Sequence, residues 1–112
     1  MKPTKMQQET QDLKVRKPES VLKEAIETHG HAAQQDMCIE EMAELTQAIL
    51  HFRRKMTPEA RQNVEQEIAD VEIMIMQMRM MFNSNNIDRI KTEKIERLRL
   101  RLEEYNKQIA EL

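Results

Sequence analysis

The chain has 112 residues, the length of one domain, and its 18 basic residues against 20 acidic ones argue against general binding of nucleic acid. One glycine and three prolines are too few for the turns of an all-β fold, and no apolar run reaches the roughly 18 residues of a membrane span. The single cysteine excludes an intrachain disulfide and suggests a reducing compartment. The sequence therefore predicts a soluble, cytoplasmic, all-α protein with no membrane partner and no nucleic-acid partner.

The N-terminal residues 1–17 are polar and lack a sustained apolar period, so we expect a flexible arm ahead of a single domain at 18–112. Pro18 suits the first position of a short helix, and apolar residues recur at helical spacing after it. The only glycine, Gly30, is expected to end this helix, because glycine readily adopts the left-handed conformation found at helix ends.

Two long amphipathic helices are predicted next, over 32–55 and from Pro58 onward, joined by a tight turn. Thr57 is expected to cap the second helix, with Pro58 in its first position. Apolar residues alternate at steps of four and three in both segments, as in a helix with one buried face. The predicted buried stripe consists of Cys38, Met42, Leu45, Ile49, Phe52 and Met56 in the first helix and of Val64, Ile68, Val71, Ile75, Met78 and Phe82 in the second.

A turn is predicted at Asn83–Asn86, followed by a last helix over 87–111 whose apolar residues again recur three and four apart. One short and three long helices of this kind predict an antiparallel helical bundle. The segment Ile73–Phe82 is apolar on almost every side, and one hairpin cannot cover both of its own faces. We therefore expect a homo-oligomer, either a dimer or a tetramer.

Four carboxylates form the most informative pattern in the chain. Glu41 and Glu44 lie three residues apart on the first long helix, and Glu67 and Asp70 lie three apart on the second. Each pair is about twelve residues from the turn, hence about 18 Å along its helix, so the folded hairpin brings both pairs level. Converging carboxylates need protons or cations, and oxygen-only ligands favour Mg²⁺, Ca²⁺ or Mn²⁺ over zinc or copper. Mg²⁺ takes further oxygens from substrate phosphates, which would make the cluster a site for nucleotide polyphosphates. The alternative is a solvated acidic face.

The segments that carry these acids resemble a known family motif. Ile39–Leu45 reads Ile-Glu-Glu-Met-Ala-Glu-Leu and Glu67–Val71 reads Glu-Ile-Ala-Asp-Val. This sequence pattern resembles that of the all-α nucleoside triphosphate pyrophosphohydrolases, the MazG-like group, over roughly residues 31–101. The resemblance implies an all-helical oligomer that uses Mg²⁺ to hydrolyse an NTP or dNTP between the α- and β-phosphates. The products would be NMP and pyrophosphate, as in house-cleaning of the nucleotide pool.

The resemblance also implies roles for the acids. It assigns metal binding to Glu41, Glu44, Glu67 and Asp70. Glu40 and Glu41 are the predicted catalytic residues, and Glu40, the first acid of the motif, either binds metal or orients the attacking water.

Three further residues are candidates for substrate binding. Gln34 shares a helical face with Glu41 and is expected to stand opposite Gln77, where an amide pair beside a metal would hold a nucleobase; the alternative is a polar edge of the bundle. Lys94 and Arg97 lie in the last helix, and the resemblance implies that they contact phosphate. The alternative for them is a solvated helix face with local ion pairs.

Two other classes of protein compete with this hypothesis. A non-catalytic helical oligomerisation or interaction module with an acidic face is the main alternative. A ferritin-like di-iron bundle requires Glu-x-x-His on two helices, and neither Glu44 nor Glu67 has a histidine three residues later.

Overall fold

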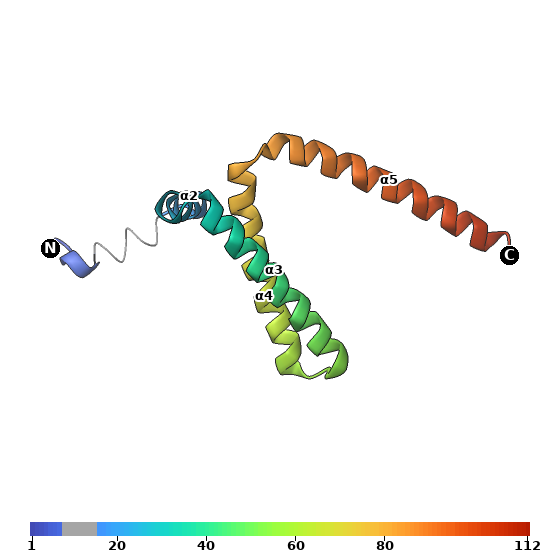
Figure 1. Ribbon diagram of the computed structural model, residues 1–112, viewed down its shortest axis with the longest axis horizontal. Helices are drawn as coiled ribbons and strands as arrows, with labels where there is room; N and C mark the ends of the chain where they lie inside the picture. The colour runs from blue at the N-terminus through green and yellow to red at the C-terminus, as the bar shows by residue number, and fades with distance from the viewer. Residues whose placement is uncertain (8–15) are drawn as a thin grey trace. The chain divides into compact units, whose positions relative to one another are not determined.

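The computed structural model describes residues 1–7 and 16–112, and every regular element in these ranges is a helix (Figure 1). The predicted all-α class is therefore confirmed for the described part of the chain. The helices are α2 (Pro18–His29), α3 (His31–Arg54), α4 (Pro58–Met81) and α5 (Ser84–Ala110). They fall into two units, Met1–Met81 and Phe82–Leu112, and each unit is considered by itself.

The predicted flexible arm falls partly outside the described residues, which exclude 8–15. Residues 5–7 form a helical turn. At its start the N–H of Gln7 donates to Thr4 Oγ1 (3.2 Å), and the N–H of Thr4 donates to Gln7 Oε1 (2.9 Å). This reciprocal pair is a capping box, which satisfies backbone donors at a helix start. The single domain predicted over 18–112 stays a prediction, because the two units are described separately.

The short first helix of the predicted domain, α2, ends at Gly30, as the sequence indicates. Gly30 has a φ of 91°, a value that residues with a side chain rarely adopt, and its N–H donates to the carbonyl of Ile26 (2.8 Å). α2 packs against both α3 and α4, and its buried residues are Leu22 and Ile26. The turn at Gly30 therefore sets how α2 lies against the two long helices.

The two long helices α3 and α4 form the antiparallel hairpin that the sequence predicts (Figure 1). Three residues, 55–57, connect them. Thr57 Oγ1 accepts a hydrogen bond from the N–H of Ala60 (3.1 Å), and Pro58 takes the first helical position. The predicted cap is therefore confirmed, and it fixes where α4 begins.

The predicted turn at Asn83–Asn86 is wrong in its extent, because α5 already begins at Ser84. Of the four residues in the predicted turn, Asn83 is the one that lies before the helix. Its side chain accepts a hydrogen bond from the N–H of Asn86 (3.0 Å). Asparagine is among the best residues for this capping position, so a cluster of turn-forming residues here starts a helix. None of the residues of α5 is buried.

The hairpin interface follows a stripe that is offset from the predicted one. On α3 it includes Gln34, Cys38, Glu41, Leu45, Ala48 and Phe52, and on α4 it includes Ala60, Val64, Glu67, Val71, Met74 and Gln77. The two small residues Ala48 and Ala60 are each 3% exposed, and they let the helix backbones approach closely. Two glutamates and two glutamines therefore stand in line with the apolar core.

Half of the predicted stripe is exposed, which corrects the prediction. The exposed members are Met42, Ile49, Met56, Ile68, Ile75 and Phe82. The reason is that the contact between the helices runs through the residue before Met42 and the residue before Ile49. Five exposed residues on one side of the hairpin, Ile39, Met42, Ile49, Ile68 and Ile75, form what we call the apolar face. Contiguous exposed apolar surface of this kind usually marks an interaction site.

Candidate metal centre

Three carboxylates converge in the middle part of the hairpin. One oxygen each of Glu41 on α3 and of Glu67 and Asp70 on α4 lies within 4.8 Å of the other two. We call this group the acidic triad. The hairpin register brings the acidic triad together, because its residues on α3 and on α4 lie at similar distances along their helices from the turn at 55–57. Three of the four residues predicted to bind metal are therefore adjacent.

Two oxygens of the acidic triad are shut off from solvent. Oε2 of Glu41 and Oε2 of Glu67 are buried, and neither has a hydrogen-bond partner among the described residues. A buried carboxylate oxygen without a donor is unfavourable unless a proton or a cation neutralises it. The donors are oxygen only, which suits Mg²⁺, Ca²⁺ or Mn²⁺ better than zinc or copper. The residues present thus fit a divalent cation.

The electrostatics of the acidic triad point the same way. Burial raises the pKa of Glu41 above its ordinary value of 4.5, and the negative charges of Glu44 and Asp70 raise that pKa further. Burial also raises the pKa of Glu67, again with the charges of Glu44 and Asp70 adding to the effect. Neighbouring negative charges therefore oppose the ionisation of Glu41 and Glu67, and a cation between the carboxylates would remove the repulsion.

Two predicted acids lie outside the acidic triad. Glu44 is exposed and one helical turn beyond Glu41, where its charge acts on both half-buried glutamates. Glu40 is also exposed and points away from the hairpin interface, since Glu41 occupies the interface position. Metal binding by Glu44 and a catalytic role for Glu40 stay predictions.

The raised pKa values predict an unusual pH dependence of stability in the absence of metal. Because the folded chain holds these two protons more tightly than the unfolded chain, their stabilising contribution is complete below pH 4.5. It is lost as the pH rises through the raised pKa values. We expect the melting temperature in EDTA to fall over this range, and to fall less in Glu67→Gln. Circular dichroism melts would measure both slopes, and identical slopes would contradict the prediction.

A buried amide pair lies two helical turns from the acidic triad. Gln34 Nε2 on α3 donates to Gln77 Oε1 on α4 (2.7 Å), and the two side chains are 8% and 4% exposed. The sequence prediction that these glutamines stand opposite each other is confirmed. A role for Gln34 in binding substrate stays a prediction.

The amide pair should be strongly coupled in stability. Gln77→Met is expected to cost about 1–3 kcal/mol, because it leaves the buried amide of Gln34 without its partner. The double variant Gln34→Met/Gln77→Met removes both amides and keeps the volume, so it should cost less than the sum of the two single changes. Urea unfolding of the unaltered chain, the two single variants and the double variant gives the free energies of unfolding that complete the double-mutant cycle. Additive losses would show that the two amides act independently.

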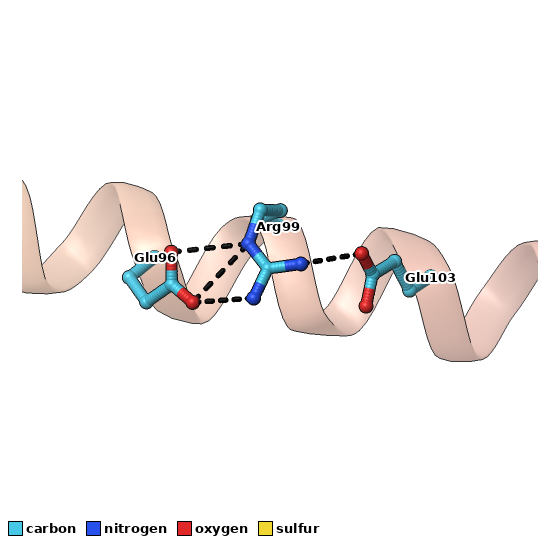
Figure 2. A network of polar contacts seen from close by, with 3 residues as sticks. All are labelled: Glu96, Arg99 and Glu103. Atoms are coloured by element: carbon cyan, nitrogen blue, oxygen red, sulfur yellow. Dashed lines mark hydrogen bonds and ion pairs between the residues drawn. The ribbon is translucent and has the colours of Figure 1, made fainter.

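The second unit consists of α5 and the residues around it, and its charges pair locally. Arg99 donates from Nε to both oxygens of Glu96 (3.1 and 3.0 Å) and from Nη1 to Glu103, as Figure 2 shows. Arg89 donates to Glu93 one turn apart (2.9 Å). These exposed pairs contribute little to stability. They do engage the carboxylates of Glu93, Glu96 and Glu103 in this part of the helix.

The predicted phosphate-binding residues Lys94 and Arg97 lie in this second unit. Within residues 1–7 and 16–112, neither takes part in an ion pair, because Arg89 and Arg99 hold the neighbouring glutamates. The local ion pairs expected in the alternative hypothesis thus form with other arginines. Both side chains remain exposed cations, and contact with phosphate stays a prediction.

The sequence reasoning missed one contribution to the surroundings of Gln34. A hollow beside it is lined by Ala25 and His29 of α2 and by Ala33 and Met37 of α3. Three of these four residues are small or aliphatic and carry no motif. The available signal was the position of His29 in the last turn of α2, immediately before the turn at Gly30.

Comparisons with known proteins add no relative. No protein-family model, no curated protein and no solved structure matches the chain. The resemblance to the MazG-like group therefore rests on the motif around the acidic triad. None of the helices within the described residues is both long and apolar enough to cross a membrane.

Proposed function

We propose that the chain is a Mg²⁺-dependent nucleoside triphosphate pyrophosphohydrolase of the MazG-like type. It would cleave an NTP or dNTP between the α- and β-phosphates and release NMP and pyrophosphate, as a cytoplasmic house-cleaning activity. The observation that carries the proposal is the acidic triad, with two solvent-inaccessible carboxylate oxygens that accept no hydrogen bond from residues 1–7 and 16–112. A solvated acidic face would leave those oxygens in contact with water.

In this proposal Glu41, Glu67 and Asp70 hold the divalent ion, and Glu44, whose charge acts on both Glu41 and Glu67, would complete the set. The ion would neutralise phosphate charge and lower the pKa of a coordinated water. Glu40, the residue before Glu41, would orient the attacking water, although its exposed side chain points away from the hairpin interface. Lys94 and Arg97 would supply positive charge to the phosphates, since no glycine-rich loop is available with one glycine.

A second function is favoured by a different observation. The apolar face suits a helical oligomerisation or interaction module, because large exposed apolar side chains on both helices need a covering partner. The two functions are compatible, since a metal site on one side of the hairpin leaves the other side free for self-association. The interaction module would rule out the enzymatic function only if the chain bound no metal.

Phosphorus NMR of a panel of NTPs and dNTPs incubated with the chain and Mg²⁺ tests the proposal most directly. The expected products are NMP and pyrophosphate, and formation should stop in EDTA. Release of inorganic phosphate and a nucleoside diphosphate would contradict cleavage between the α- and β-phosphates. No product from any member of the panel, with Mg²⁺ or Mn²⁺, would reject the enzyme and leave the interaction module.

A further inference from the structure

The last helix, α5, carries an apolar stripe that residues 82–112 leave uncovered. Its members follow one another at steps of three and four, the spacing of a coiled-coil seam. Their exposed fractions run from 48% to 60%, and no residue of α5 is buried. The stripe consists of Ile95, Leu98, Leu102, Tyr105 and Ile109. A sustained apolar row on an otherwise polar helix is typical of a surface that packs against a partner.

The start of this stripe has the shape that receives another helix. A pocket of about 440 Å³ lies there, and it is lined by Ile87, Ile90, Lys91, Lys94, Ile95 and Leu98. The last four of these occupy positions i, i+3, i+4 and i+7 of one helix. Four residues at these positions form the hole that takes a knob side chain in a coiled coil. The pocket therefore suits a protruding apolar side chain of a partner helix.

The charges that border the stripe on one side are positive. Lys94 and Arg101 stand four residues before and three residues after Leu98, so they lie on its side of the helix. Within the described residues, neither of these two cations takes part in an ion pair. An apolar stripe with free cations at its border is complementary to an apolar stripe with carboxylates at its border.

The acids of α5 do not cancel this positive border. Glu96 and Glu103 each directly follow a stripe residue, so each is turned by about 100° from that residue around the helix axis. Both are engaged by Arg99, as Figure 2 shows. These two carboxylates are therefore neutralised on another side of the helix, and the cations at the border keep their charge for a partner.

A second copy of α5 would not use the positive border. With Ile95 at position a of a heptad, Lys94 takes position g and Arg99 position e. In a parallel pair of helices g faces e of the other chain, so Lys94 would meet Arg99. In an antiparallel pair Arg101 would face Gln108 or a second Arg101, which gives a neutral contact or repulsion.

We infer that α5 binds an amphipathic helix of another protein, whose apolar heptad positions are bordered by glutamate or aspartate. Apolar side chains of that helix enter the holes along the stripe, and its carboxylates pair with Lys94 and Arg101. The inference goes beyond the two functions proposed above, because it uses neither the acidic triad nor the apolar face.

Two synthetic peptides of three heptads test the inference with the full chain. Both carry isoleucine at position a and leucine at position d, and one has glutamate and the other lysine at positions e and g. By isothermal titration calorimetry we expect the acidic peptide to bind at least about tenfold more tightly than the basic one, and less tightly as salt is added. Equal binding of the two peptides, or no binding of the acidic one, would overturn the inference.

A charge reversal on α5 gives the sharpest control. Lys94→Glu/Arg101→Glu makes the border negative, so the basic peptide should now bind at least about tenfold more tightly than the acidic one. Lys107→Glu is the matched control, because Lys107 is exposed and two residues from both Tyr105 and Ile109, hence on the opposite side of the helix. It should keep the preference for the acidic peptide. If one reversal on the opposite side abolishes the preference, or two at the border leave it intact, the border does not select the partner and the inference is wrong.

A variant of the stripe tests the apolar part of the contact. Leu98→Ala/Leu102→Ala keeps strong helix formers and should weaken binding of the acidic peptide at least about tenfold, with an unchanged circular dichroism spectrum. Undiminished binding would show an ionic contact without the stripe and contradict the inference.

Two other occupants of the stripe are distinguished by the same variant. Suppose that the unaltered chain ignores the acidic peptide but binds vesicles of phosphatidylcholine with phosphatidylglycerol, and that Leu98→Ala/Leu102→Ala does not bind them. The stripe would then lie on a membrane. If this variant instead lowers the mass of an assembly to 13.4 kDa in analytical ultracentrifugation, a second copy covers the stripe. Either result would overturn the inference and leave the enzyme proposal untouched.

Discussion

Asp70→Asn and Glu67→Gln should each lower Mg²⁺-dependent turnover by a factor of about 100 or more, since the loss even of groups that support metal ligands costs 10–100-fold. Each change keeps the shape of the side chain and removes one charge from the acidic triad. The cation would lose a ligand, and bound substrate would lose a contact to its phosphates. Steady-state assays over a range of Mg²⁺ concentrations measure the effect, which should appear in the Mg²⁺ requirement as well as in kcat.

The same variants should behave oppositely when metal is absent. Removing one of several mutually repelling carboxylates should leave the melting temperature in EDTA unchanged or raise it. Mg²⁺ should raise the melting temperature of the unaltered chain by mass action and raise that of the variants less. Glu72→Gln is the matched control, because Glu72 is exposed on α4 and outside the acidic triad. Normal Mg²⁺-dependent hydrolysis by both Asp70→Asn and Glu67→Gln would contradict the proposed metal site.

Lysine at two positions of the apolar face should dissociate an oligomer. We expect the unaltered chain to sediment at a multiple of 13.4 kDa at micromolar concentration, because Ile39, Met42 and Ile49 on α3 are exposed beside exposed isoleucines on α4. Met42→Lys/Ile49→Lys places two charges in that contact and should shift the mass to 13.4 kDa. Analytical ultracentrifugation over a concentration series measures the change.

A control for added charge is available on the same helix. Gln47 is exposed on α3 and is not part of the apolar face, so Gln47→Lys should leave the mass of the assembly unchanged. A mass near 13.4 kDa for the unaltered chain across the whole concentration range would contradict self-association. The apolar face would then need a different partner.

The hairpin was predictable because its signals are local. Thr57-Pro58 marks a helix start through one capping hydrogen bond, and the apolar residues of both long helices recur at a helical period. The equal height of Glu41, Glu67 and Asp70 along the hairpin follows from the length of the turn and the rise per residue. Neither step requires knowledge of which side chains pack against which.

The choice of face was not predictable in the same way. Hydrophobicity favours Met42 over Glu41 as the buried residue, yet Glu41 stands in the hairpin interface and Met42 is exposed. A helix with two apolar sides allows both choices, and the small residues Ala48 and Ala60 settle the packing by close approach of the backbones. Sequence periodicity records that a side is apolar, but it does not record which of two apolar sides meets the other helix.

The hollow beside Gln34 could not be predicted from the sequence, for a related reason. Its walls come from α2 and α3, and the angle between those helices depends on the backbone at Gly30. A glycine that ends a helix is easy to recognise, but the direction that the chain takes afterwards is not encoded in any periodicity.

At Gly30 the constraint is torsional and not steric. A Cβ built there would meet nothing within 4 Å, so the position has room for a side chain, while its φ of 91° strains any residue that has one. An alanine would relieve that strain by returning to helical dihedrals and merging the flanking segments into one rod from Pro18 to Arg54. Ala25 and His29 would then swing away from Ala33 and Met37. The two backbone torsions of Gly30 (φ 91°, ψ 158°) thus hold one wall of the hollow in place, although Gly30 itself does not line it.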